Sequence, residues 1–247
     1  MTASILLPAE LLTLLYRRIP RHNPISYPVS RRASIKDVLE SLGLPHPEIG
    51  AILINGRPAA FAHRLTAGDQ VEVAPLAAPV NVETPDLLRP ALTRIRFAVD
   101  LNVGKLAALL RLAGFDTLYN PRMNDAELAE TSSDRVLLTR DRTLLMRRVV
   151  QHGHLIRYAH PEAQLAEVIK LYGLADRLRP FSRCLTCNNV LEPVAKAEIL
   201  SRLQPLTKKY YDTFNRCRGC AQIYWPGSHR ERMTAVLDRL RTACRQG

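Results

Sequence analysis

The sequence predicts an α/β protein made of two folded units and a cysteine-rich C-terminal segment. Three observations predict this organisation. Apolar runs of strand length alternate with amphipathic runs of helix length, a stretch with four prolines at 75–90 divides the chain, and two Cys-x2-Cys pairs stand in the last third. The 247 residues suffice for two domains with cores of their own. A content of 47% apolar and 23% charged residues excludes a disordered or fibrous chain.

The sequence carries no sign of a membrane segment or an export signal. No apolar run approaches the ~18 residues that span a bilayer, and residues 1–18 lack the basic flank and the cleavage site of a signal peptide. We therefore expect a cytoplasmic protein with no membrane partner.

The charge of the chain is unevenly distributed. The net charge is +12, of which residues 1–90 carry +1 and residues 91–247 carry +11, and the last third, 181–247, carries +7. A positive field of this kind attracts polyanions, and nucleic acid is the commonest large polyanion in a cytoplasm. The alternative is a solvated basic surface without a partner.

The first unit, residues 1–78, has a mixed pattern. A helix is expected at 35–42, capped by Ser34, followed by a strand at 51–54 with an Asn-Gly turn and a strand at 71–73. This order is typical of the β-grasp (ubiquitin-like) fold. The phrases INGRPAAF and LTAGDQVEV resemble ubiquitin-like sulfur carriers, but the chain continues without the terminal Gly-Gly of a carrier or modifier. We expect this domain to dock on a protein partner, with a linker at 79–90.

The second unit, residues 91–180, predicts a largely parallel sheet, because strands and helices alternate in it. The expected strands cover 95–99, 135–139 and 155–156, and the expected helices cover 105–112 and 161–172.

Two carboxylates follow the predicted strands of this unit, Asp100 after the first and Asp141 after the second. The carboxyl ends of parallel strands form ligand sites, and Mg²⁺ and Mn²⁺ prefer carboxylate oxygens. A metal held there activates water and neutralises charge on a phosphate. The alternative is that each acid makes a local turn hydrogen bond.

A third acid, Asp125, follows the predicted helix cap Asn124. It is a candidate metal ligand, or else a first-turn acid that complements the helix dipole. We expect Asp116 and Asp134 to be turn residues. Four arginines beside Asp141 are candidate phosphate ligands for RNA or, alternatively, a solvated helix face: Arg140, Arg142, Arg147 and Arg148.

Several short motifs occur in an order that resembles a known family. FAVDLNVGKLAALLRLAGFDT, then NDAEL, then RVLLTRDRTLL, is similar to the Mut-seven C-terminal RNase domain, a branch of the PIN-like nucleases. The resemblance covers about 95–160 and continues through a zinc ribbon to about 235. It implies metal-dependent cleavage of RNA by water. The resemblance implies that the site residues of this family correspond to Asp100, Asn102, Asp125 and Asp141, with Asn102 as an orienting residue.

Four cysteines form the strongest local motif. Cys184 and Cys187 are separated by 29 residues from Cys217 and Cys220, and two such knuckles supply the four thiolates of a closed, structural zinc site. Two disulfides or a redox pair are the alternatives. We expect Cys244 to be a free thiol. Ser228 and Glu231 have the spacing of a capping box for a closing helix.

The sequence therefore predicts a PIN-like parallel-sheet domain at 91–180 with a C-terminal zinc ribbon and closing helix at 181–247, preceded by a β-grasp domain. The predicted function is that of a metal-dependent endoribonuclease, a hydrolase with structural Zn and catalytic Mg or Mn. The rival is a non-catalytic, zinc-containing RNA-binding or ribosome-associated adaptor.

Overall fold

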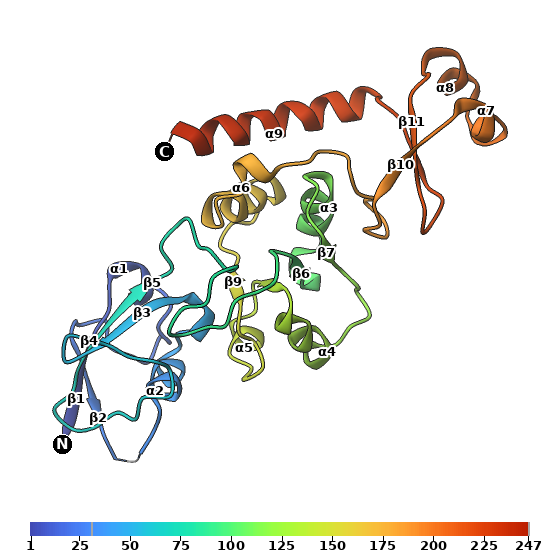
Figure 1. The fold of residues 1–247 in the computed structure, drawn as a ribbon. Coiled ribbons are helices and arrows are strands. Elements are labelled where there is room, and N and C mark those ends of the chain that lie inside the picture. Colours follow the sequence, from blue (N-terminus) through green and yellow to red (C-terminus); the bar gives the residue numbers. More distant parts are fainter. Residues whose placement is uncertain (31, 247) are drawn as a thin grey trace.

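The protein consists of three parts arranged in a row, with a long C-terminal helix running back along the middle part (Figure 1). The computed structural model describes the main chain of residues 1–30 and 32–246, and within helix α9 (Ser228–Gln246) the side chains of 233–242. The predicted capping pair Ser228–Glu231 and the Cys244 thiol lie outside the described side chains. In the described part of the chain, every helix is too short or too polar to cross a bilayer.

The N-terminal domain is a mixed five-stranded sheet in the order β2-β1-β5-β3-β4, with β1 and β5 parallel and the other pairs antiparallel. Its strands are β1 (Thr2–Leu6), β2 (Ile25–Pro28), β3 (Ile49–Ile54), β4 (Arg57–Pro58) and β5 (Gln70–Pro75). Its helices are α1 (Ala9–Leu12), α2 (Ile35–Leu42) and the short turn η1 (His46–Glu48). The predicted ubiquitin-like fold is confirmed.

Helix α2 forms where the sequence predicts it. The Ser34 hydroxyl accepts a hydrogen bond from the Asp37 N–H and satisfies a free donor of the first turn. Its buried residues recur at helical spacing, and Gly43 ends it with φ +106°. A Cβ atom at Gly43 would lie 2.7 Å from the main-chain nitrogen of Tyr16, so this turn requires glycine.

The middle domain contains a four-stranded, wholly parallel sheet in the order β7-β6-β8-β9. The strands are β6 (Phe97–Val99), β7 (Thr117–Leu118), β8 (Val136–Thr139) and β9 (Gly153–Leu155). The helices are η2 (Leu101–Val103), α3 (Gly104–Leu112), α4 (Asp125–Glu130), η3 (Thr131–Ser133), α5 (Arg142–Leu145), α6 (Pro161–Leu171) and η4 (Ala175–Arg177). The predicted parallel sheet is confirmed, and β7 is a strand that the sequence analysis missed.

Both faces of this sheet are covered, which explains why its strands are apolar without alternation. Phe97 and Leu138 pack into a core that includes residues of α3, α6 and α9. Ala98 and Leu137 point to the other face, where they pack against residues of α4 and α5. The sheet is therefore a buried layer between helices.

The strand order places a topological switch point between β6 and β8. From β6 the chain passes through α3 to β7 on one side, and then through α4 across β6 to β8 on the other side. The connections diverge between β6 and β8, and open α/β sheets bind ligands at the carboxyl ends of strands where this happens. Asp100 and Asp141 immediately follow these two strands.

The C-terminal part is a small three-stranded sheet followed by the closing helix. Its strands are β10 (Leu191–Val194), β11 (Phe214–Cys217) and β12 (Ile223–Tyr224), all antiparallel. Its short helices are α7 (Lys196–Ile199), η5 (Leu200–Arg202) and α8 (Pro205–Tyr210). Met233 and Leu237 of α9 are buried in the core of the middle domain, so this helix fastens the ribbon to that domain.

The predicted linker at 79–90 runs between the two domains, and a few of its residues anchor it to both of them. Val82 is buried in the core of the middle domain, and the Val80 N–H donates to the Leu171 carbonyl at 2.7 Å. The buried Arg89 donates to main-chain carbonyls of the N-terminal domain, including that of Ile49. The segment is an ordered strap between the domains.

A buried ionic cluster joins the N-terminal domain to the edge strand β9. The Glu48 carboxylate accepts hydrogen bonds from the Leu155 N–H at 2.7 Å and from Arg157 at 2.9 Å, and it contacts His154 at 2.9 Å. The second nitrogen of His154 contacts Glu167 at 3.1 Å. Both Glu48 and His154 are buried, so this cluster holds the domains in one arrangement.

The cluster shifts the ionisation of both partners. Burial alone would lower the pKa of His154, but the Glu48 and Glu167 carboxylates outweigh it and raise the pKa to about 9. Burial alone would raise the pKa of Glu48, but His154, the Leu155 N–H and Arg157 hold it below its usual value. Since an unfolded histidine has a pKa of 6.5, protonated His154 stabilises the fold fully below that pH.

We predict that this stabilisation is lost as the pH rises through 9, because His154 then loses its proton in the folded state as well. Thermal unfolding of the wild type and of His154→Gln measures it. The melting temperatures should differ most at and below pH 6.5 and converge above pH 9. A difference that stays constant with pH would contradict the role of His154.

Candidate active site and zinc centre

The hydroxyl of Thr139 links the two acids at the crevice. Thr139 is the last residue of β8 and is fully buried. Its Oγ1 donates to Oδ2 of Asp100 at 2.5 Å and accepts the Asp141 N–H at 2.8 Å. The hydroxyl therefore joins the Asp100 carboxylate to the main chain of Asp141, at the ends of adjacent parallel strands.

Asn102 completes this unit from the other strand. Its Nδ2 donates to Oδ2 of Asp100 at 2.6 Å, and its Oδ1 accepts the Arg140 N–H at 3.1 Å. The amide thus bridges the end of β6 to the end of β8. Asp100 also caps η2 by accepting the Leu101 N–H at 2.6 Å, and Asp141 caps α5 by accepting the Thr143 N–H at 2.7 Å. The turn hydrogen bonds that the sequence analysis offered as an alternative are present in addition to the link.

Asp125 lies apart from this unit. It is the first residue of α4, and Asn124 and Glu127 form the capping box of that helix. The Asp125 carboxylate is 57% exposed and faces the Arg147 guanidinium at 3.9 Å. Among the described residues, the four cysteines are the only group of three or more His, Cys, Asp or Glu side chains placed to hold a metal ion, and their sulfurs lie within 4.8 Å of one another. The three acids are therefore not brought together to that degree.

A hollow of about 490 Å³ adjoins Asn102. Lys105, Tyr119 and Gln164 are among the residues that line it, and they offer a cation, a phenol and an amide in the same hollow as Asn102. A Cβ atom at Gly104 would lie 2.4 Å from the Tyr119 hydroxyl, so a larger residue there would displace this tyrosine from the start of α3.

The four arginines lie on and around α5, next to Asp141. Arg140, Arg147 and Arg148 are exposed, and Arg142 is half-buried. The Arg142 guanidinium carbon lies 5.6 Å from the centre of the Tyr16 ring, which belongs to the N-terminal domain. The positive charge beside the acids is therefore continuous with the domain junction.

The four cysteines form two knuckles of equal geometry. In the first, Asn188 N–H donates to the Cys184 carbonyl at 3.0 Å, and in the second, Ala221 N–H donates to the Cys217 carbonyl at 3.0 Å. Asn188 and Ala221 both have positive φ, of 68° and 56°. The repeated turn directs the sulfurs of each pair to one point.

The cluster fits zinc. The sulfurs of Cys184 and Cys220 lie 3.5 Å apart, and those of Cys187 and Cys217 lie 3.2 Å apart. Both distances exceed the about 2.05 Å of a disulfide and approach the about 3.8 Å edge of a tetrahedron with Zn–S bonds of about 2.3 Å. Four sulfur ligands leave no open position, so a bound zinc would be structural.

Ionisation of the thiols also favours a cation. Burial opposes ionisation of Cys187, but hydrogen bonds from Asn189 lower its pKa to about 6. The Gln222 main chain favours the thiolate of Cys220, but burial and the neighbouring thiols raise its pKa to about 12. Four sulfurs this close resist sharing negative charge, and a divalent metal removes that conflict.

The first knuckle is fastened to the middle domain by buried polar groups. Arg111 of α3 donates to the carbonyls of Leu185 and Thr186, both at 2.9 Å. The Asn188 side chain accepts the Thr117 N–H of edge strand β7 at 3.0 Å and donates to Asp116. Asp116, predicted as a turn residue, is held between this amide and Arg135.

Sequence reasoning did not identify Thr139, Arg111 or Glu48 as key residues. A polar Thr139 at the end of an otherwise apolar strand was a readable signal. Arg111 and Glu48 stand within amphipathic or turn segments, and their partners are 74 and 107 residues away in the chain. Their roles follow from tertiary contacts alone.

We predict one tightly bound zinc ion per chain, which native mass spectrometry measures. Cys217→Ser should lose the metal and lower the melting temperature, because a structural zinc contributes its binding free energy to folding. Cys244→Ser leaves both knuckles intact and serves as the control. The assignment would be overturned by a wild type that carries no metal after production with sufficient zinc. It would also be overturned by a Cys217→Ser variant that retains the full amount of zinc.

Comparison with known families agrees with this architecture. A family model described as Mut7-C RNAse domain matches residues 95–237, and one described as Mut7-C ubiquitin matches residues 2–81. Neither the curated proteins nor the solved structures contain a match to the chain. An RNase domain indicates a nuclease-like function with RNA as the substrate, and the RNase match alone spans more than half of the chain. The chain therefore belongs to the Mut7-C RNAse family, with a Mut7-C ubiquitin-like domain at its N-terminus.

Proposed function

We propose that the protein is a metal-dependent endoribonuclease that hydrolyses RNA phosphodiester bonds. The observation that carries the proposal is the unit in which Thr139 joins Asp100 and Asp141 at the carboxyl ends of β6 and β8. Asp100 and Asp141 are the metal ligands, and Asn102 orients Asp100. The family match supports RNA as the substrate.

The donor set suits Mg²⁺ or Mn²⁺, which prefer carboxylate oxygen and water. When bound, such an ion supplies an activated water and neutralises charge on the phosphate. Asp125 is the third carboxylate of the proposal. Since Mg²⁺ keeps several of its waters, Asp125 contributes through water and not by direct contact. Its ion pair with Arg147 keeps it in the same region.

The arginines on and around α5 supply the positive charge that binding of the RNA backbone requires. Two carboxylates repel the RNA backbone, and a phosphate that approaches them needs cations nearby. Arg140, Arg142, Arg147 and Arg148 lie next to Asp141 in the sequence and on the surface, and guanidinium groups bind phosphate through two parallel hydrogen bonds. We propose that they hold the substrate in a cytoplasmic enzyme, with the ubiquitin-like domain also available to a protein partner.

We predict that Asp100→Asn and Asp141→Asn each reduce Mn²⁺-dependent cleavage of labelled RNA by about 100-fold or more, since loss of metal charge stabilisation costs several kcal/mol. Asp125→Asn should cause a smaller loss. Asp134→Asn is the matched control, because Asp134 precedes β8 and lies at the amino end of that strand, opposite to the carboxyl end that Asp141 follows. If all four variants cleave RNA at the rate of the wild type, the mechanism is ruled out. RNA binding without any turnover would favour the adaptor.

We predict that Thr139→Val lowers cleavage by about 10- to 100-fold, because outer groups that orient metal ligands have effects of this size. Thr139→Ser keeps the hydroxyl and should retain most of the activity. The melting temperature of each variant is measured to show that it is folded at the assay temperature, and cleavage is compared across Mn²⁺ concentrations. If the valine and serine variants behave alike, the hydroxyl does not position the acids.

A further inference from the structure

We propose that Gln164 is a specificity-determining residue, and that its side-chain oxygen accepts a hydrogen bond from the ribose 2′-hydroxyl of the nucleotide beside the cleaved bond. This inference rests on the proposed ribonuclease function and deepens it, because it names the group by which the site prefers RNA to DNA. The contact lies in the hollow that adjoins Asn102.

The proposed chemistry does not by itself distinguish RNA from DNA. The oxygen of a metal-activated water bonds to phosphorus while the bond from phosphorus to the leaving oxygen breaks, and the leaving oxygen takes the proton that the water gives up. The 2′-hydroxyl takes no part in this step. A preference for RNA must therefore come from a contact with the 2′-hydroxyl, which both donates and accepts hydrogen bonds.

The Gln164 amide offers an acceptor for such a contact. Gln164 belongs to α6, is buried with 4% of its surface exposed, and is among the residues that line the hollow. Its Nε2 donates to the carbonyls of Tyr158 at 3.0 Å and Ala159 at 3.3 Å. The opposite orientation of the amide would turn its oxygen toward two carbonyl oxygens, so these two bonds fix which atom is the oxygen.

The oxygen of this amide has no donor. In the described part of the chain, Oε1 of Gln164 is buried and receives no hydrogen bond. A buried acceptor without a donor lowers the stability of a protein, and each such atom in a native fold calls for a physical explanation. A hydroxyl of a ligand in the hollow would supply the donor.

The same hollow holds a cation that suits the phosphate of a nucleotide. Lys105, the second residue of α3, lines the hollow and is exposed. In the described part of the chain it forms no ion pair with a carboxylate. A lysine ammonium group binds phosphate as a point charge. Because the ribose is bonded directly to its phosphate, a phosphate on Lys105 favours the ribose, and not the more distant base, as the donor to Gln164.

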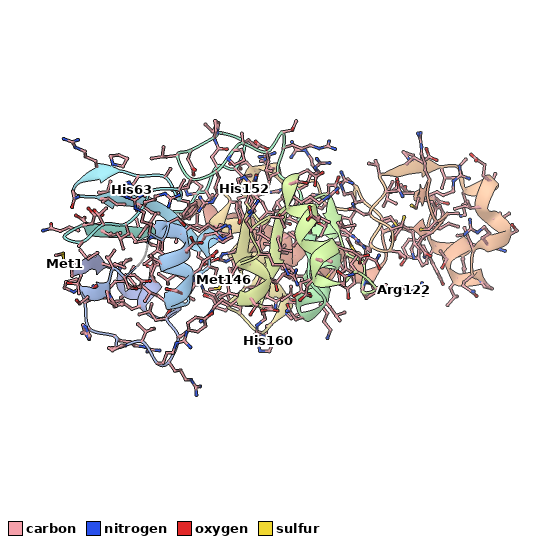
Figure 2. All side chains as sticks on the ribbon, turned by 90° about the horizontal axis from the view of Figure 1, so that it is seen from below. Met1, His63, Arg122, Met146, His152 and His160 are labelled. Atoms are coloured by element: carbon pink, nitrogen blue, oxygen red, sulfur yellow. The ribbon has the colours of Figure 1, made fainter. Side chains whose placement is uncertain are left out.

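Asn102 connects the hollow to the proposed metal ligands. It lines the hollow, and its Nδ2 donates to Oδ2 of Asp100 at 2.6 Å. A nucleotide in the hollow is therefore next to the bond that the proposed metal cleaves. The side chains of Leu101 and Asn102 are exposed, and Figure 2 shows His160, the residue before α6, at the outer edge of the middle domain. RNA can therefore enter from solvent.

We predict that the 2′-hydroxyl groups of single-stranded RNA contribute to binding through Gln164. The full chain carrying Asp141→Asn is titrated with a labelled RNA and with its fully 2′-fluoro counterpart, which keeps an RNA-like sugar but has no donor at the 2′ position. The 2′-fluoro strand should bind about 3- to 10-fold more weakly, the size expected for one hydrogen bond between neutral groups. Fluorescence anisotropy measures both affinities.

Gln164→Met in the same background should remove this difference, because methionine fills a similar space without the acceptor. Gln151→Met is the matched control, since Gln151 is exposed and precedes β9 at the amino end of that strand; it should keep the full preference. Lys105→Gln should weaken both strands alike, by about fourfold at about 0.15 M salt, and reduce the salt slope by about 0.7.

Equal binding of the two strands by the Asp141→Asn protein would overturn the proposal without reference to any Gln164 variant, and would leave a water molecule as the partner of Oε1. A preference that Gln164→Met retains would overturn it too. So would an unchanged affinity in Lys105→Gln, because no phosphate would then bring the ribose into the hollow.

The binding assay is independent of turnover. A wild type that fails to cleave RNA, with a 2′ preference that still depends on Gln164, removes the ribonuclease proposal and leaves this contact. Cleavage that needs Asp141, with no 2′ preference in binding, removes this contact and leaves the enzyme.

Discussion

The hydrogen bonds of Thr139 determine how the proposed site is built. One buried hydroxyl fixes the Asp100 carboxylate from the neighbouring strand and the main chain that precedes the Asp141 side chain. It can do so because β6 and β8 are adjacent and parallel, and because the chain connections diverge between them. Two acids from distant parts of the sequence thereby follow adjacent parallel strands at the same end of the sheet. The proposed metal chemistry presupposes this arrangement.

The other parts of the chain stabilise the sheet at its two edges. A parallel sheet of four strands leaves main-chain donors free on its outer strands. On β7 the Thr117 N–H donates to Asn188 of the first cysteine knuckle, and on β9 the Leu155 N–H donates to Glu48 of the N-terminal domain. The ribbon and the ubiquitin-like domain therefore act as edge caps, and each also brings basic residues to the middle domain.

Local patterns in the sequence predicted much of this fold. Helix α2 was predictable from Ser34 and Gly43, the knuckles from cysteine spacing, and the parallel sheet from alternation of strands and helices. Strand β7 was not predictable, because two residues carry no period. The Glu48–His154 cluster depends on a contact between positions more than 100 residues apart, which no local pattern reports. For the proposed site, the strand ends pointed to Asp100 and Asp141, but no local pattern indicated that Asp125 faces Arg147.

The most direct test of the account is the binding of Mn²⁺ to the full chain. Electron paramagnetic resonance measures it as the loss of the signal of the free ion. A zinc ion bound by the four cysteines would be silent in this measurement. The account predicts that the wild type takes up Mn²⁺ at a site that Asp100→Asn, Asp141→Asn and Thr139→Val each weaken strongly, while Asp134→Asn leaves it unchanged. Uptake that is the same in all five proteins would contradict a metal centre built on the Thr139 hydroxyl.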